Sequence, residues 1–157
     1  MPKLSALEYA LKLLGYRARS ERELRERLAD KKYQPDDITA ALEKLRKIKL
    51  VDDETFAVNY VRDKLAISRR GPRRIYFELI KHGVTKEIAE RATKTVVAAD
   101  ELATATALIQ SRSRQWAKLA PPARYRRAIG LLSRRGFSPG VIRDVLRDWP
   151  RYASLED

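Results

Sequence analysis

The densest cluster of potentially reactive side chains in this sequence is acidic. Asp52, Asp53 and Glu54 are consecutive, and carboxylate oxygens are the ligands that Mg²⁺ prefers. The cluster directly precedes an amphipathic segment, where carboxylates cap a helix and oppose its dipole, and we favour this structural role. The single histidine, His82, precedes Gly83 at the expected end of another helix, where we expect it to interact with the terminal carbonyl groups.

The second group of side chains is cationic. The chain carries 34 Lys and Arg against 21 Asp and Glu, a formal net charge of +13. No acidic residue occurs between Asp63 and Glu78 or between Glu101 and Asp144. Arginine predominates over lysine there, and its guanidinium group binds phosphate or carboxylate through two hydrogen bonds. From charge alone we predict that these stretches bind DNA or a DNA-bound protein, although Arg134 and Arg135 also suit a helix C-terminus.

The candidate binding residues of these two stretches are Lys64, Arg69, Arg70, Arg73, Arg74, Arg112, Arg114, Lys118, Arg124, Arg126, Arg127, Arg134 and Arg135. We expect the clusters around Arg70 and Arg126 to lie at equivalent positions of a repeat, on one continuous surface.

The sequence lacks the residues that most enzymatic reactions need. The absence of cysteine excludes disulfides and thiolate chemistry, and one histidine argues against a zinc site or a Ser–His–Asp triad. No GxxxxGK[ST], HExxH or CxxC pattern occurs. We predict a protein that is not an enzyme, with no catalytic residue, metal or cofactor. No apolar run approaches the roughly 20 residues that span a bilayer, and no secretory signal is evident, so we expect a cytoplasmic protein that does not enter a membrane.

The elements that would position these groups are helices, because apolar residues recur at i, i+3, i+4 and i+7. In the first helix this stripe comprises Leu7, Ala10, Leu11 and Leu14. Capping boxes are predicted at Ser5 with Glu8 and at Ser20 with Glu23. The second helix should run from Glu21 to about residue 32.

A helical pattern recurs along the chain. The stripe Ile38, Ala41, Leu42 and Leu45 is repeated by Ile142, Val145, Leu146 and Trp149. Its lead-in, Tyr33-Gln34-Pro35, is matched by Phe137-Ser138-Pro139. A weaker copy around Val84 has a turn that we take to be one residue shorter, with Ile88 in the place of Ile38. Turns at Tyr33, Val84 and Phe137 thus recur about every 50 residues, a period that indicates stacked helical modules.

We predict an all-α fold of nine helices in three tandem three-helix repeats, covering residues 1–50, 51–99 and 100–157. Gly71-Pro72 and Pro121-Pro122 start the second helices of the later modules, since proline suits the first helical position. The helix after Pro122 should bury Tyr125, Ala128, Ile129 and Leu132. Trp116 and Trp149 are expected to be core anchors. Modules of this size bury little alone, so neighbours should share part of their cores.

Residues 20–45 have helix-turn-helix proportions, which would indicate a protein that recognises a DNA sequence. In that motif the second helix enters the major groove through its N-terminus. Here that N-terminus is Asp36-Asp37, and two carboxylates would face the phosphates. A transcription factor is therefore disfavoured.

The order of several short motifs resembles the RecX family, whose members regulate the RecA recombinase. The motifs are Ser20-Glu21-Arg22-Glu23-Leu24 with Leu28, Leu50-Val51-Asp52-Asp53 followed by Phe56-Ala57, Gly71-Pro72, Glu78-Leu79, Gly83-Val84, and Arg134-Arg135-Gly136-Phe137 with Ile142. The resemblance covers roughly residues 7–149.

The resemblance implies three three-helix repeats in an elongated, curved molecule that acts in DNA recombination and repair. It further implies a monomer that binds in the groove of the RecA–DNA filament, inhibits the recombinase, ATPase and coprotease activities, and in some members binds single- or double-stranded DNA. Two alternatives stay open. One is a general nucleic-acid-binding helical protein, and the other is a helical scaffold that binds an acidic protein without nucleic acid.

Overall fold

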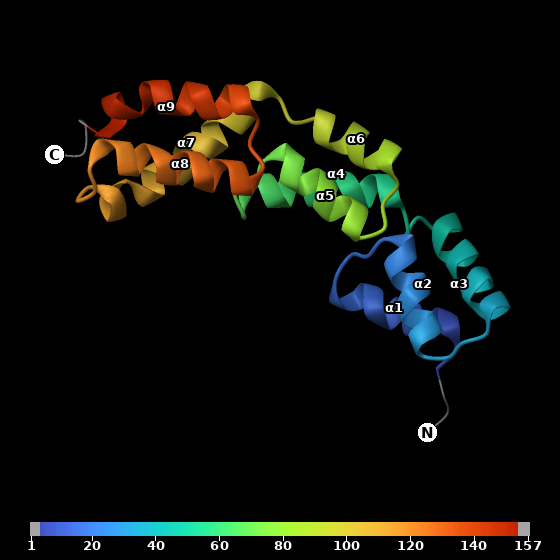
Figure 1. Ribbon diagram of the computed structural model, residues 1–157. Coiled ribbons are helices and arrows are strands. Elements are labelled where there is room, and N and C mark those ends of the chain that lie inside the picture. Colours follow the sequence, from blue (N-terminus) through green and yellow to red (C-terminus); the bar gives the residue numbers. More distant parts are fainter. Residues whose placement is uncertain (1–3, 154–157) are drawn as a thin grey trace.

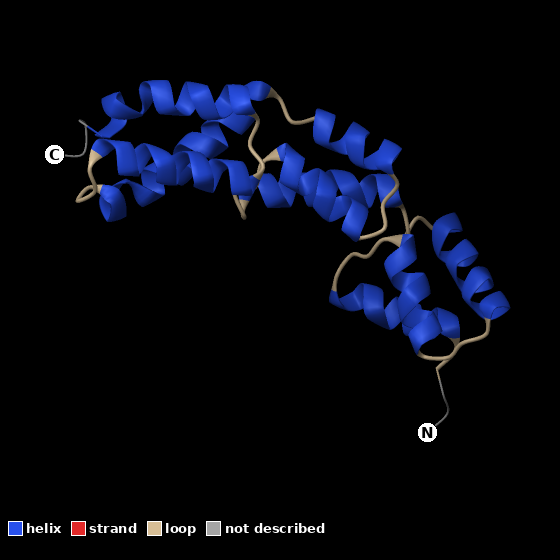
Figure 2. Cartoon of the chain, in the orientation of Figure 1, coloured by secondary structure: helices blue, strands red, loops and turns tan. Residues whose placement is uncertain are grey.

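The computed structural model describes residues 4–153, and within them it contains nine α-helices and no strand (Figure 2). The helices are α1 (Ala6–Tyr16), α2 (Glu21–Asp30), α3 (Pro35–Lys47), α4 (Asp53–Ala66), α5 (Pro72–Lys81), α6 (Lys86–Lys94), α7 (Ala98–Trp116), α8 (Pro121–Arg135) and α9 (Pro139–Ala153). They form three consecutive triplets in an elongated, curved array (Figure 1). The predicted all-α fold of three tandem three-helix repeats is confirmed.

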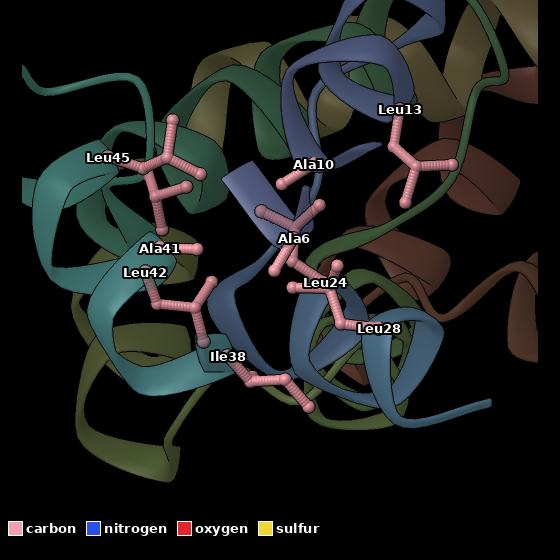
Figure 3. Close-up of a cluster of buried hydrophobic side chains, with 10 residues drawn as sticks. Ala6, Ala10, Leu13, Leu24, Leu28, Ile38, Ala41, Leu42 and Leu45 are labelled. Atoms are coloured by element: carbon pink, nitrogen blue, oxygen red, sulfur yellow. The ribbon is translucent and has the colours of Figure 1, made fainter. Parts of the chain in front are cut away.

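Each triplet closes around its own apolar core. In the first, side chains of α1, α2 and α3 converge, with Ala10, Leu24 and Leu42 among those completely buried (Figure 3). Separate clusters form within α4–α6 and within α7–α9. Val51 joins the first cluster, although the limits proposed from the sequence assign it to the second module. Those limits remain proposals.

The helix starts follow the predicted capping chemistry. Both capping boxes, at Ser5 and at Ser20, are present. The Asp52 carboxylate accepts hydrogen bonds from the backbone N–H groups of Glu54 and Thr55 and so caps α4. The Asp53 carboxylate instead accepts the N–H of Glu21, at 2.9 Å, and so caps α2 of the preceding triplet. The acidic cluster is therefore structural, and residues 4–153 contain no group of acidic or histidine side chains suited to a metal ion.

Two residues predicted for the core lie outside it. Leu11 is 41% exposed and Ile129 is 45% exposed. A helix turns about 100° per residue, and the buried line on α1 passes through Ala6, Ala10 and Leu13, with Leu11 well away from it. Small alanines at that line let α1 approach its neighbours closely. The buried line on α8 passes through Ala128 and Leu132, which leaves Ile129 at its edge. Trp116 and Trp149 are buried as predicted and meet edge to face.

The turn between the second and third helices has the same geometry in every repeat. The N–H groups of Tyr33, Val84 and Phe137 donate to the carbonyl oxygens of the residues five positions earlier, Leu28, Leu79 and Leu132, at 3.3, 3.1 and 3.1 Å. The residue before each donor, Lys32, Gly83 or Gly136, has a left-handed backbone. The prediction of a shorter middle turn is wrong, because Ala89, not Ile88, occupies the buried position of Ile38.

The second helices of the three triplets, α8, α5 and α2, follow one another end to end (Figure 1). At the junction of α8 with α5, the N–H of Gly71 donates to the carbonyl oxygen of Arg135 at 2.7 Å, and the N–H of Arg73 donates to that of Gly136 at 3.1 Å. At the junction of α5 with α2, the Ser20 hydroxyl donates to the carbonyl oxygen of His82. The unpaired donors of one helix start thus meet the unpaired acceptors of another helix end.

These junctions require glycine after the helix end. A Cβ atom on Gly136 would lie 2.3 Å from the backbone nitrogen of Arg74, and one on Gly83 would lie 2.5 Å from the Cβ of Arg22. Both glycines also have the positive φ that other residues adopt only with strain. Neighbouring triplets are therefore joined by close packing at the glycine that follows each helix end.

Candidate binding surface

The α8–α5 junction brings the two predicted arginine stretches together. Arg73 and Arg74 lie in the first turn of α5, while Arg134 and Arg135 lie in the last turn of α8. Because Gly71 bonds to the end of α8, these four cationic side chains, separated by about 60 residues in sequence, gather at one point of the molecule.

Several of the predicted binding arginines are engaged within the fold. Arg70 and Arg74 both donate to the carboxylate of Glu78, at 2.9 Å, and the Tyr60 hydroxyl donates to it at 3.1 Å. Burial alone would raise the pKa of Glu78, but these hydrogen bonds outweigh it and hold that pKa below its usual value. Arg70 and Arg74 therefore stabilise the start of α5.

Two more candidates bind carbonyl oxygens at helix ends. Arg135 donates to the carbonyl of Ser68 at 2.6 Å, across the junction. Arg124 donates to the carbonyls of Leu119 and Ala117, at 2.7 and 2.5 Å, and so ties the start of α8 to the end of α7. Both side chains are therefore held by the fold itself.

Of the remaining candidates, Arg73 lines a hollow between α5, α8 and α9 that is described below, and the others fall into two sets. Arg112, Arg126, Arg127 and Arg134 line one cleft of about 670 Å³ along α7 and α8, and we call these four residues the α8 arginine band. Arg126, Arg127 and Arg134 are exposed and form no ion pair within the described residues. The structure does not place Lys64, Arg69, Arg114 and Lys118 in this cleft; the Lys64 ammonium lies over the Tyr60 ring.

We expected the two arginine stretches to form one continuous surface. In the structure, Arg134 is the candidate residue that connects them. Arg126 lies in the first half of α8, eight residues before Arg134, or about 12 Å along the helix at 1.5 Å per residue. Arg134 lines both the cleft of the α8 arginine band and a second hollow at the junction. The surface is therefore a band along α8 that reaches α5 at one end.

The second hollow, which we call the junction groove, lies between α5, α8 and α9 and has a volume of about 940 Å³. Its apolar residues are Phe77, Ile129, Phe137, Pro139, Ile142 and Leu146, and its charged residues are Arg73, Arg74, Glu78, Lys81, Arg134 and Arg143. Phe77 is 66% exposed. Phe77, Lys81 and Arg143 are not among the binding residues predicted from the sequence. The available signal was a large apolar residue, Phe77, lying off the buried Ile75–Leu79 line of α5.

The histidine does not have the predicted role. The Nδ1 atom of His82 lies 2.9 Å from the carboxylate of Glu23, which also binds Arg17 at 2.9 Å. Burial would raise the pKa of Glu23, but the hydrogen bonds from Arg17, His82 and the Ser20 backbone lower it to about 2. His82 thus links the second triplet to the first instead of binding terminal carbonyls, because the end-to-end junction brings Glu23 to it.

The fold and this surface define a class: a basic, helical repeat protein with a band of exposed arginines along one helix. Across residues 4–153, no helix combines the length and the apolar character needed to cross a bilayer. Models of the first, second and third three-helix domains of RecX match residues 6–45, 52–92 and 99–146. The chain belongs to the RecX family.

Relatives named "Regulatory protein RecX" support this assignment. The protein of Mycolicibacterium vanbaalenii is 38% identical over 144 residues, which cover 87% of this chain and 77% of that protein. The protein of Geobacillus thermodenitrificans is 35% identical over 152 residues, covering 97% of this chain and 56% of the relative. The crystal structure of RecX from Lactobacillus salivarius has the same fold, with a TM-score of 0.82 at 24% identity over 91% of this chain and 93% of that one. The family is thus one of regulatory proteins.

Proposed function

We propose that this protein regulates the RecA recombinase by binding the filament that RecA forms on DNA. Bound as a monomer in the cytoplasm, it restrains the recombinase, ATPase and coprotease activities of that filament, and so acts in recombination, repair and the SOS response. Regulation by occupying sites on the filament requires no catalytic residue in this protein.

The α8 arginine band is the observation that supports this proposal. A filament on DNA presents phosphates and acidic protein side chains along a groove. Arg126, Arg127 and Arg134 offer guanidinium groups that no carboxylate of residues 4–153 neutralises. The elongated, curved array (Figure 1) is a shape that contacts several filament subunits at once. Of the binding residues predicted from the sequence, we therefore favour those of the α8 arginine band.

The test is a measurement of RecA ATPase activity and strand exchange with and without the protein. Inhibition should increase with protein concentration and saturate as filament sites fill. Unchanged strand exchange at one protein per few RecA subunits would contradict the proposal.

The large net charge favours a second candidate, direct binding to nucleic acid without RecA. Phosphate contacts release counterions, so this activity would show a steep linear fall of log K with log salt concentration. Tight, salt-dependent binding to single- or double-stranded DNA, together with no effect on RecA, would favour this candidate over the first.

A further inference from the structure

The junction groove has a feature that phosphate binding does not explain. Its floor is apolar, with the side chains of Phe77, Ile129, Ile142 and Leu146 reaching solvent between α5, α8 and α9. Single exposed apolar side chains are common, but several that line one hollow with a polar rim are typical of an interaction site. Two members, Phe77 and Ile129, are 66% and 45% exposed.

The rim of the groove is strongly cationic. Arg73, Lys81, Arg134 and Arg143 line it and form no ion pair within the described residues. The single carboxylate that the described residues place there, on Glu78, already accepts hydrogen bonds from Arg70, Arg74 and Tyr60. The groove therefore presents uncompensated positive charge around an apolar floor.

We propose that the junction groove binds an acidic, amphipathic helical segment of the protein partner, with aliphatic or aromatic anchors on the floor and carboxylates at the rim. An amphipathic helix presents anchors at i, i+3, i+4 and i+7 to such a groove. This inference rests on the proposed function in taking the partner to be the recombinase filament.

Other occupants fit the groove less well. Single-stranded nucleic acid would meet the cationic rim but would leave the aliphatic side chains of Ile129, Ile142 and Leu146 without an apolar partner. A second copy of this chain carries the same net charge of +13, which opposes self-association. Arg134 lines both this groove and the cleft of the α8 arginine band. The partner's protein segment and the DNA phosphates can accordingly be bound side by side.

The test uses the absence of cysteine from the sequence. Ser133 is exposed and lines the groove, so S133C carries an environment-sensitive fluorophore beside the floor. The probe is a short helical peptide with Leu at i, i+3, i+4 and i+7 and Glu elsewhere. Comparison probes replace Glu by Lys, or Leu by Ser, and a further probe is oligo(dT). We expect a fluorescence change with the Glu/Leu peptide alone.

Substitution of apolar residues on the floor of the junction groove provides a second test. The double variant F77S/I129S should weaken binding of the Glu/Leu peptide, and of the RecA filament in co-sedimentation, by at least about thirtyfold, the loss expected when an interface hot spot is removed. The control I67S removes a side chain that is 80% exposed and lies outside the groove, and it should change neither. K81E/R143E should also weaken binding of the Glu/Leu peptide, because it replaces two cations of the rim with carboxylates.

The outcomes separate this inference from the proposed function. If the filament binds F77S/I129S as tightly as the unsubstituted protein and the peptide leaves the fluorophore unchanged, the groove assignment is wrong and filament binding stands. A response to oligo(dT) in place of the peptide also overturns the assignment. If the peptide binds but the filament does not, filament binding is wrong and the groove assignment stands.

Discussion

At the scale of single residues, one turn position shows how the repeats differ. Lys32, Gly83 and Gly136 all have a left-handed backbone after the second helix of their repeat. Gly83 and Gly136 each have a residue of the preceding triplet packed against them, Arg22 and Arg74 respectively, whereas Lys32 is exposed. The backbone conformation belongs to the repeat, but the requirement for glycine comes from the junction.

We expect Gly136→Ala to destabilise the protein markedly. The left-handed conformation alone costs about 1–2 kcal/mol for a residue with a Cβ atom, and the added carbon would lie 2.3 Å from the backbone nitrogen of Arg74. The loss is measured as the free energy of unfolding in urea. Lys32→Gly is the matched control and should stabilise the protein by up to about 1 kcal/mol, because it relieves the same backbone strain. If the stability lost with Gly136→Ala were no larger than the stability gained with Lys32→Gly, the junction would contribute nothing.

The second residue-scale prediction concerns pH. The pKa of Glu23 is about 2 in the folded protein, against an ordinary 4.5. A lowered folded pKa gives stability that is complete above about pH 4.5 and is lost as the pH falls towards 2. Glu23→Gln removes this contribution, so the stability difference from the unsubstituted protein should shrink over that window. Urea unfolding at several pH values measures it.

Glu26→Gln is the control for the pH prediction. Glu26 pairs with Arg22 on the exposed surface of the same helix, where its side chain is 62% exposed. Such pairs contribute little to stability, so this variant should follow the pH profile of the unsubstituted protein. If the two variants had the same profile, the link between Glu23, Arg17 and His82 would not be the cause.

At the scale of helices, one buried carboxylate connects two elements of the third triplet. Glu101 lies in the first turn of α7, is 6% exposed, and accepts the N–H of Ser138 at the start of α9, at 2.6 Å. We expect Glu101→Ala to cost about 1–3 kcal/mol, because it leaves a part-buried donor without a partner. Asp100→Ala, in the same turn but exposed, should change stability by less than about 0.5 kcal/mol. Chemical denaturation distinguishes them, and equal losses would contradict a cap by Glu101.

The helices and their caps could be predicted from the sequence because their signals are local. Ser20 and Glu23 are three residues apart, and Ile38 with Leu45 marks a helix face. The contacts between triplets could not be predicted, since Asp53 caps a helix that starts 32 residues earlier. The same limit applies to the candidate surface. Charge identified Arg124 and Arg126 alike, but only the fold shows that Arg124 binds the end of α7 while Arg126 lines an open cleft.

At the scale of the whole molecule, the proposed surface must be distinguished from net charge. R126E/R127E reverses two exposed members of the α8 arginine band that form no ion pair within residues 4–153. We expect it to weaken filament binding strongly and to flatten the dependence on salt, by about one unit of slope for each arginine that no longer binds a phosphate. Stability should change by less than about 0.5 kcal/mol. Binding isotherms at several salt concentrations and thermal unfolding provide the measurements.

R25E/R27E makes the same change of net charge on α2, in the first triplet. Arg25 there pairs with Glu21, and neither residue lines the cleft of the α8 arginine band or the junction groove. This variant should therefore retain most of the filament affinity. Equal losses from the two double variants would mean that only the total charge matters, and the surface along α8 would have to be abandoned.

The end-to-end junctions also bear on polymerisation. An interface that joins the end of one helix to the start of another is heterologous, and copies joined by such an interface form closed rings or open-ended fibres. Both outer ends of the α8–α5–α2 row lack what a junction uses. At the end of α2, Lys32 carries a side chain at the turn position where Gly83 and Gly136 have none. At the start of α8, the second helical residue is Pro122, which has no N–H, whereas the second residue of α5, Arg73, donates its N–H to Gly136. The backbone packing that joins the three repeats is thus blocked at both outer ends of the row, and we therefore expect this protein not to assemble end to end.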